Sequence, residues 1–421
     1  MLEHYFTKPE TADRVREIWI GKSIEEYVVW LSYQGFSPRT VHRQVPLLRR
    51  FGEVAWDLGA REHKELPKHV DPFIDIWMGE HKRRSTKKRS MYSIRREIRS
   101  TVEQFLKIVL RGYTGNSKKE KEPFSNTVPA FFSYLRNERG LGEISMRRYF
   151  LHLRRVEKYL NKISLSDLST LSPIILSSFV SEISHYLGKW AMRELCCVLR
   201  VFLRYLYQER VIPRDLSHTI EAPQIYRLSG IPRSISWGEV GLLLEKIDRR
   251  TPTGKRDYAI FLLLITYGLR ACEVSKLTLD DIDWKRERLY ILARKAGQST
   301  AYPLSVMVGE AIIDYIKHGR PETPDRHLFF RAYAPRTPIT NGAISALASH
   351  YIRRAGIQVA KPGSHTLRHT CAQRLVDASF SFKMIGDYVG HRSSSSTEIY
   401  TKVDIEALRK VACENEEEDI L

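Results

Sequence analysis

RDYAIFLLLITYGLRACEVSKL, residues 256–277, places a long apolar run directly before a glycine and a polar segment. The run is shorter than the roughly 18 to 20 residues that cross a bilayer, so the helix that it predicts belongs inside a folded protein. Gly268 interrupts the run, because glycine favours turns over helix interiors. The stretch therefore predicts a helix, a turn and a second helix, with Arg270 just after the turn.

The neighbouring segments predict one short sheet in a mostly helical block. RLYILAR (288–294) and AYPLS (301–305) alternate in hydrophobicity and are joined by a short polar connection, as in a β-hairpin. Ser236 followed by Glu239 is a capping-box pattern that marks the start of a helix. From 340 to 415 the pattern is helical again. The predicted fold class is mainly α, with a small antiparallel sheet.

Two breaks divide the chain into three predicted domains. TGNSKKEKEP (114–123) is charged and poor in apolar residues, and proline and glycine interrupt the helical pattern in EAPQIYRLSGIPRS (221–234). The first two domains are predicted to be helical bundles. The expected domains are residues 1–120, 121–225 and 226–421.

The first two domains look like copies of one helical design. Each has an aromatic-rich helix, a glycine break, a serine with an arginine two positions on, and a helix ending in paired arginines. The paired positions are Ser37 with Ser145, Arg39 with Arg147, Arg96 with Arg193 and Phe105 with Phe202. The alternative is that any two amphipathic bundles share such patterns.

The charge of the chain predicts a polyanionic partner. Lys and Arg total 68 against 49 Asp and Glu, a formal net charge of +19. Such an excess suits nucleic acid, and the alternative is a solvated basic surface. Neither a signal-peptide pattern nor a membrane-spanning run is present in the sequence, so we expect a cytoplasmic protein. Five cysteines without shared spacing form neither a disulfide framework nor a CxxC metal pair.

Six side chains in the third domain suit attack on a phosphodiester. Guanidinium groups can hold its non-bridging oxygens, whose negative charge grows in the transition state. A tyrosine can attack phosphorus if a base and positive charge assist it, and a lysine can protonate the leaving 5'-oxygen. These cations supply the charge that a metal would otherwise provide, so neither a metal nor a cofactor is expected. The six residues are Arg270, Lys295, His365, Arg368, His391 and Tyr400.

Each of these residues also has an ordinary structural explanation. A tyrosine after a turn is more often a core or surface aromatic, and a buried arginine more often pairs with a carboxylate. The interpretation as a phosphodiester-cleaving site rests on the order of the six residues along the chain and on the sequence around each of them. His365 and Arg368, at i and i+3, share one face if that turn is helical. In GHRSSSSTEIYTK (390–402), a serine-rich turn separates His391 from Tyr400.

Taken together, these motifs resemble the tyrosine recombinase (phage integrase) family. The resemblance is strong over residues 226–405, extends to 126–215 as that family's helical core-binding domain, and is fainter over 20–112. HxxR alone would be a weak signal. The resemblance implies a mostly α catalytic domain whose small antiparallel sheet has three strands, as in DNA breaking-rejoining enzymes. The motifs are Arg270 in YGLRACEVSKLTLDDID, Lys295 eight residues before Pro303 of YPL, His365 and Arg368 in HTLRHT, and VGH followed nine residues after its His391 by Tyr400.

The resemblance implies covalent catalysis by the tyrosine. Tyr400 would attack the scissile phosphate to give a 3'-phosphotyrosyl link and a free 5'-hydroxyl. Lys295 would protonate the leaving oxygen, and His365 would accept the tyrosine proton. The serine-rich turn would place the tyrosine on a separate short helix.

The resemblance also implies how the phosphate is held. Arg270 and Arg368 would bind the non-bridging oxygens, and His391 would donate a further hydrogen bond to them. Glu273 would orient Arg270 or His365. All positions of the family's usual set are filled, so an active enzyme is expected.

The implied partner is double-stranded DNA at recombination sites. The resemblance implies a tetramer on two DNA sites, in which the amphipathic helix after Tyr400 docks on the neighbouring protomer. Accessory or partner recombinase proteins are expected in some reactions. No membrane is expected to take part. The chain departs from the family plan at its N-terminus, where residues 1–113 resemble a second DNA clamp. The expected DNA contacts are Arg39, Lys82, Arg83, Arg84, Lys87, Lys88, Arg89, Arg147, Arg148 and Arg193.

The resulting hypothesis is a site-specific recombinase that serves integration, excision or transposition of a mobile element. One alternative keeps the chemistry and relaxes supercoils, as a type IB topoisomerase does. Another is a DNA-binding protein on the same fold without catalysis. The complete residue set, with Tyr400 at the family's spacing, argues against the second alternative.

Overall fold

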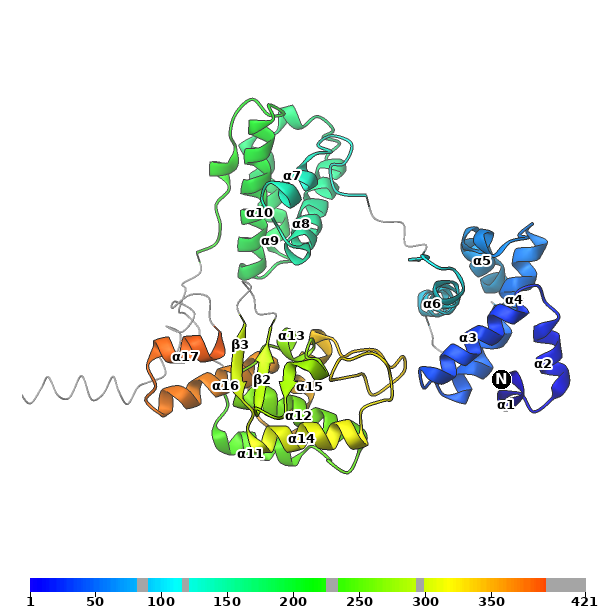
Figure 1. Cartoon of the computed structure of the whole chain (residues 1–421). Coiled ribbons are helices and arrows are strands. Elements are labelled where there is room, and N and C mark those ends of the chain that lie inside the picture. Colours follow the sequence, from blue (N-terminus) through cyan, green and yellow to red (C-terminus); the bar gives the residue numbers. More distant parts are fainter. Residues whose placement is uncertain (82–89, 116–120, 225–233, 293–298, 391–421) are drawn as a thin grey trace, which may run out of the picture. The chain divides into compact units, whose positions relative to one another are not determined.

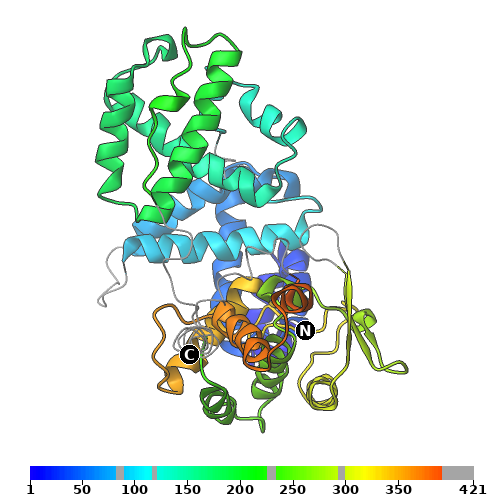
Figure 2. The same ribbon diagram turned by 90° about the vertical axis from the view of Figure 1, so that its left-hand side faces the viewer.

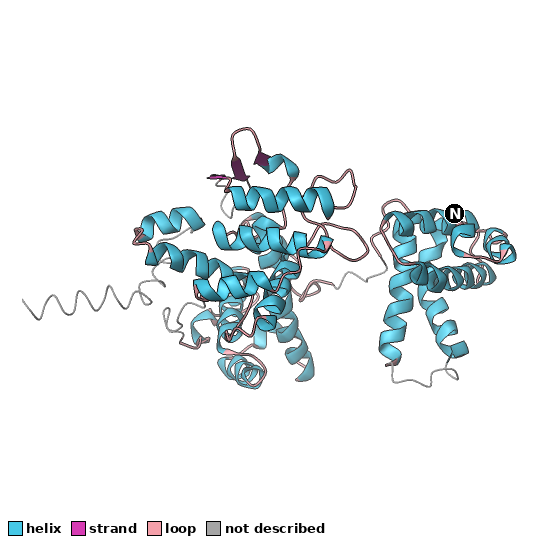
Figure 3. Cartoon of the chain, turned by 90° about the horizontal axis from the view of Figure 1, so that it is seen from below, coloured by secondary structure: helices cyan, strands magenta, loops and turns pink. Residues whose placement is uncertain are grey.

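The computed structural model describes residues 1–81, 90–115, 121–224, 234–292 and 299–390. These residues form helices joined by turns and loops, with one small sheet, so the predicted fold class is confirmed (Figures 1 and 3). Among the helices of this part of the chain, none is both long and apolar enough to cross a membrane.

The N-terminal part, up to residue 115, packs around its own aromatic core. Tyr27, Phe51, Phe73 and Phe105 are fully buried there. The Tyr27 hydroxyl donates to the side-chain oxygen of Gln44, which ties α3 to α4. The helices are α1 (Leu2–Tyr5), α2 (Pro9–Arg16), α3 (Gly21–Tyr33), α4 (Pro38–Asp57), the 3-10 helix η1 (His63–His69), α5 (Val70–His81) and α6 (Met91–Val109).

The middle part of the chain, described over residues 121–224, forms a compact unit with a separate core. Phe131 packs edge-on against Phe202 and Tyr205, and the long helices α8 and α10 run side by side (Figures 1 and 2). Its helices are α7 (Phe131–Asn137), α8 (Glu143–Lys162), η2 (Leu168–Thr170), α9 (Pro173–Ser184), α10 (Lys189–Gln208) and η3 (Ser217–Thr219).

The C-terminal part is built around α12, which is buried along most of its length. It packs against α14 and α16 and carries most of the quoted apolar run (Figure 1). The capping box of Ser236 and Glu239 begins α11 as predicted. The helices are α11 (Trp237–Glu245), α12 (Pro252–Thr266), α13 (Ala271–Val274), η4 (Leu279–Asp281), α14 (Val306–His318), α15 (Asn341–Arg354), α16 (Ser364–Asp377) and α17 (Phe382–Val389).

The predicted sheet has three antiparallel strands in the order β1 (Ile282–Asp283), β2 (Arg288–Ile291) and β3 (Thr300–Pro303). Leu289 pairs with Tyr302, and both point into the core. The hairpin is therefore confirmed over its strands.

Candidate active site

The turn after α12 depends on Gly268. Its φ of +59° lies in the left-handed region, which costs a residue with a Cβ about 1–2 kcal/mol. A Cβ there would meet Cys371 Sγ and Val389 Cγ1 at 3.1 Å each. The glycine thus lets α12, α16 and α17 approach closely at the point where α13 begins.

Arg270 is held by a buried carboxylate. Its backbone N–H donates to Glu273 Oε2 and its Nη1 to Glu273 Oε1, both at 2.8 Å. The Glu273 side chain is 2% exposed and that of Arg270 is 23% exposed. Of the two partners proposed for Glu273, the carboxylate therefore binds Arg270. The guanidinium still reaches solvent, and its Nη2 donates to Gly390 O at 2.7 Å.

Arg368 is buried on α16 and also binds backbone carbonyls. Its Nη1 donates to Gly268 O at 2.5 Å and its Nη2 to Val389 O at 2.6 Å. The last carbonyls of a helix lack intrahelical partners, and α17 ends at Val389, followed by the left-handed C-cap residue Gly390. Arg270 and Arg368 therefore converge on the end of α17, directly before His391.

His365 lies one turn before Arg368 on α16 and is exposed. Partial desolvation of its ring lowers its pKa, and the positive charges of Arg368 and Arg270 lower it further. A lowered pKa keeps the imidazole neutral at neutral pH, and only the neutral form accepts a proton. The four described members of the predicted set, Arg270, Glu273, His365 and Arg368, thus lie in one neighbourhood.

The other predicted catalytic residues, Lys295, His391 and Tyr400, lie outside the described residues. The same holds for part of the predicted DNA contacts. These are Lys82, Arg83, Arg84, Lys87, Lys88 and Arg89.

The remaining predicted DNA contacts are exposed. Arg39 lies in the first turn of α4, Arg147 and Arg148 near the start of α8, and Arg193 near the start of α10. Arg148 Nη1 forms an ion pair with Glu194 Oε1 at 3.1 Å, which the sequence did not indicate.

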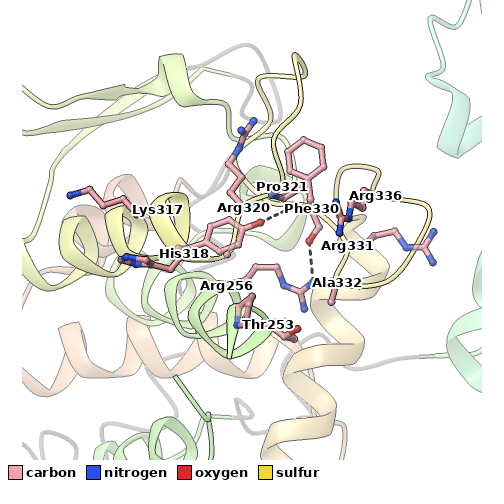
Figure 4. A pocket seen from close by; sticks show the side chains of 13 residues that line it. Thr253, Arg256, Lys317, His318, Arg320, Pro321, Phe330, Arg331, Ala332 and Arg336 are labelled. Carbon is pink, nitrogen blue, oxygen red and sulfur yellow. Dashed lines mark hydrogen bonds between the residues drawn. The ribbon is translucent and has the colours of Figure 1, made fainter. Parts of the chain in front are cut away.

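A buried ion pair lies in the first half of α12, about 15 Å along the helix axis from Thr266, since Arg256 stands ten residues before it at 1.5 Å each. Arg256 donates from Nε and Nη2 to Asp257 Oδ1. Its Nη1 donates to Phe330 O (Figure 4). The Tyr351 hydroxyl donates to Asp257 Oδ2. Desolvation raises the pKa of Asp257, and Arg256 opposes that rise. In the sequence, this pair is visible as two adjacent charged residues, Arg256 and Asp257, at the start of an apolar run.

Arg256 also lines a cavity of about 510 Å³ (Figure 4). Among the described residues that line it, five are Lys or Arg and none is acidic. Arg320 is fixed there by bonds to the carbonyls of Asp325 and His327, and its guanidinium lies over the Phe330 ring. None of the predicted catalytic residues lines the cavity, so residue geometry rather than cavity size marks the candidate active site.

Comparison with known families assigns two segments of the chain. Residues 235–406 match the phage integrase family, and residues 128–210 match its N-terminal SAM-like domain. The first segment contains every member of the predicted catalytic set.

Individual proteins agree with these matches. The putative integrase/recombinase y4rA of Sinorhizobium fredii is 35% identical over 68% of this chain and 69% of its own length. A second one from that organism, y4rF, is 26% identical over 98% of this chain and 95% of its own length. In fold, the chain is similar to the XerH site-specific recombinase bound to its palindromic difH substrate, with a TM-score of 0.54 and 20% identity over 68% of this chain and 84% of XerH. The chain therefore belongs to the phage integrase family of tyrosine recombinases.

Proposed function

We propose that this protein cuts and rejoins double-stranded DNA at specific sites through a 3'-phosphotyrosyl intermediate, for integration, excision or transposition of a mobile element. The observation that carries the proposal is the convergence of two distant arginines, Arg270 and Arg368, on the carbonyls of Val389 and Gly390. Such paired guanidinium groups suit a phosphate whose charge grows during reaction.

In the proposed reaction, Tyr400 Oη attacks phosphorus and the bond from phosphorus to the 5'-oxygen breaks. The tyrosine proton passes to His365, and Lys295 gives a proton to the leaving oxygen. Attack by another 5'-hydroxyl reverses these steps and rejoins the strand. The phosphotyrosyl bond conserves the energy of the phosphodiester, so no ATP is needed.

Arg270 and Arg368 would bind the two non-bridging oxygens, and His391 would donate to them as well. Glu273 supports this role, since it orients Arg270 and is itself almost completely buried. The carbonyl bonds of both arginines would be exchanged, at least in part, for bonds to phosphate when DNA binds.

A covalent-trapping assay tests the proposal. The protein is incubated with nicked duplexes from the DNA that flanks its own gene, denatured and separated on a gel. We expect an adduct whose mass maps to the Tyr400 peptide. Tight binding without an adduct would contradict the proposed chemistry and favour a DNA-binding regulator.

The protonation state of His365 predicts the acid limb of the pH profile. Because its pKa is lowered, His365 stays neutral at pH values where an ordinary histidine, with a pKa of about 6.5, is half protonated. The inflection of the single-turnover cleavage rate should therefore lie below pH 6.5. The measurement is this rate between pH 5 and 8.

His365→Gln provides the control for that profile. It should lower the plateau rate by about 10²- to 10⁴-fold, the usual contribution of a general base, and remove the acid limb. An inflection at or above pH 6.5, or an acid limb that persists in the variant, would assign the limb to another group.

We also propose a tetramer on two DNA sites, held by the segment after Tyr400. This segment begins with apolar residues at helical spacing: Val403, Ile405, Leu408 and Val411. Deleting residues 404–421 should abolish cooperative assembly on two-site DNA while single-site binding remains, as measured by native gel shift. Cooperative assembly by the truncated protein would refute this role.

The domain assignment follows from the same proposal. Residues 226–421 would form the catalytic domain, 121–225 the core-binding domain and 1–120 a further DNA-binding domain. Within the last, the basic stretch at 82–89 would contact phosphates. A DNA recombinase acts where chromosomal DNA lies, so we place it in the cytoplasm on the nucleoid.

A further inference from the structure

The N-terminal helices repeat the middle unit in their backbone geometry. Helices α4 and α8 are both 20 residues long, and the first and last residues of α8 each stand 105 positions after those of α4. A glycine with positive φ precedes each helix at the same offset, Gly35 and Gly140. A residue with positive φ also follows each helix, Gly59 and Ser164, again 105 apart. The repeat therefore includes the turns on both sides of the helix.

The buried positions follow the same register. Matching positions on α6 and α10 are 97 residues apart in the sequence, which is the separation predicted by the match of Arg96 with Arg193. On α4 and α8 the structure corrects the sequence: Ser37 corresponds to the N-cap Gly142 and not to Ser145, because core packing sets the register. The matching buried pairs are Val41 with Met146, Leu48 with Leu153, Phe51 with Val156, Ala55 with Leu160, Ile98 with Leu195, Val102 with Leu199, Phe105 with Phe202, and Leu106 with Leu203.

An ion pair between the two helices is repeated as well. Arg43 Nη1 lies 2.6 Å from Glu97 Oε1, and Arg148 Nη1 lies 3.1 Å from Glu194 Oε1. The two arginines are again 105 positions apart in the sequence, and the two glutamates are 97 positions apart. The arginine side chains are 59% and 60% exposed, and the glutamates 38% and 39%. Exposed pairs contribute only about 0–1 kcal/mol, so stability alone gives little reason for this repetition.

The cations beside these pairs correspond too. Arg96 takes the place of Arg193, and both are exposed on their helices. Neighbouring Arg95 and Arg99 are instead paired with Asp75 and Asp71 on α5. Within the described part of the chain, Arg96 takes part in no ion pair, so its charge faces solvent uncompensated.

We infer that α4 and α6 form a second DNA clamp, in which Arg43 and Arg96 bind backbone phosphates as Arg148 and Arg193 would in the first. The inference rests on the proposed function. The SAM-like match covers residues 128–210 and therefore does not assign DNA binding to α4 and α6. The similarity to y4rF covers 98% of this chain and so includes the N-terminal helices as well as the middle unit. Glu97 holds Arg43 in place while leaving its other donors available. Each protomer would then grip DNA at two segments.

Salt-dependent binding tests the inference. The probe is a fluorescein-labelled, mixed-sequence duplex of about 50 base pairs, titrated by anisotropy over a NaCl series, with the full chain carrying Tyr400→Phe. Arg43→Ser/Arg96→Ser should reduce the slope of log K against log salt by about 1.8, since each phosphate contact contributes about 0.9. Arg148→Ser/Arg193→Ser should give a similar loss.

The matched control is Arg14→Ser/Lys64→Ser, which removes the same charge from exposed positions on α2 and η1 of the same unit. It should leave the slope nearly unchanged. A further variant, Glu97→Gln, separates binding from structure. A phosphate-binding Arg43 predicts equal or tighter DNA binding in this variant, whereas a purely structural ion pair predicts the same loss as Arg43→Ser.

Two outcomes would overturn the inference. The first is an unchanged slope in Arg43→Ser/Arg96→Ser with helical circular dichroism intact. The second is an unchanged slope with fewer protomers assembled on DNA, which would make this surface a protein interface. Either result would leave the proposed function standing if the protein with Tyr400 intact still forms the covalent adduct; absence of that adduct is the separate failure of the proposed function.

Discussion

A Tyr400→Phe variant is expected to form no covalent adduct with DNA, while its DNA affinity stays within about threefold of the unchanged protein, or roughly 0.7 kcal/mol. Phenylalanine keeps the ring and removes only the hydroxyl that would attack phosphorus. Binding depends on the cations, which the substitution leaves in place. The measurements are adduct formation on a nicked duplex and affinity by anisotropy.

Tyr333→Phe is the control for this experiment. Tyr333 is 82% exposed on a loop outside the predicted catalytic set, so the same chemical change there should preserve the adduct. An adduct formed by the Tyr400→Phe variant would identify another nucleophile and refute the assigned role. Loss of binding in that variant would show that Tyr400 contributes to DNA recognition.

Asp257→Ala is expected to lower the free energy of unfolding of the C-terminal part by about 3–5 kcal/mol, as when one partner of a buried ion pair is removed. The Asp257 and Arg256 side chains are 2% and 8% exposed, so the substitution leaves a buried guanidinium without its carboxylate. The Tyr351 hydroxyl also loses its acceptor. The loss should appear in full-length protein as faster hydrogen exchange of α12 amides, measured by mass spectrometry.

Asp280→Ala supplies the matched comparison. Asp280 and Arg326 form an ion pair whose side chains are 62% and 60% exposed, and such pairs contribute about 0–1 kcal/mol. Both variants remove one carboxylate from an Asp–Arg pair in the same part of the chain, but Asp257 is buried and also accepts from Tyr351, whereas Asp280 is exposed. Equal effects on α12 protection would mean that the Arg256–Asp257 pair does not stabilise the fold.

Local rules accounted for much of the C-terminal fold. The apolar run predicted α12, Gly268 predicted its end, and alternation predicted the β2–β3 hairpin. Helix periodicity also put His365 one turn from Arg368. Each of these features depends on residues close together in the chain, so propensity and turn chemistry were enough to predict them.

The candidate site was predicted as a set of residues but not as an arrangement. The sequence left open whether Glu273 serves Arg270 or His365, and the structure shows that Arg270 donates to its carboxylate at the start of α13. Nothing in the local pattern indicated that Arg270 and Arg368 share the end of α17, because those bonds join residues 21 to 120 positions apart. The predicted matches Ser37–Ser145 and Arg39–Arg147 on α4 and α8 were wrong by three residues, because buried positions and not polar ones set the register of the repeat.

The sequence by itself determined the family chemistry, the helical class and the positions of the turns, since each is written in residue types at short spacing. Only the tertiary structure decided which carbonyls the arginines bind, which charges are buried, and that the pairs Arg43–Glu97 and Arg148–Glu194 are equivalent. The physical reason is that burial and long-range polar contacts depend on how whole helices pack, and no short window of sequence contains that information.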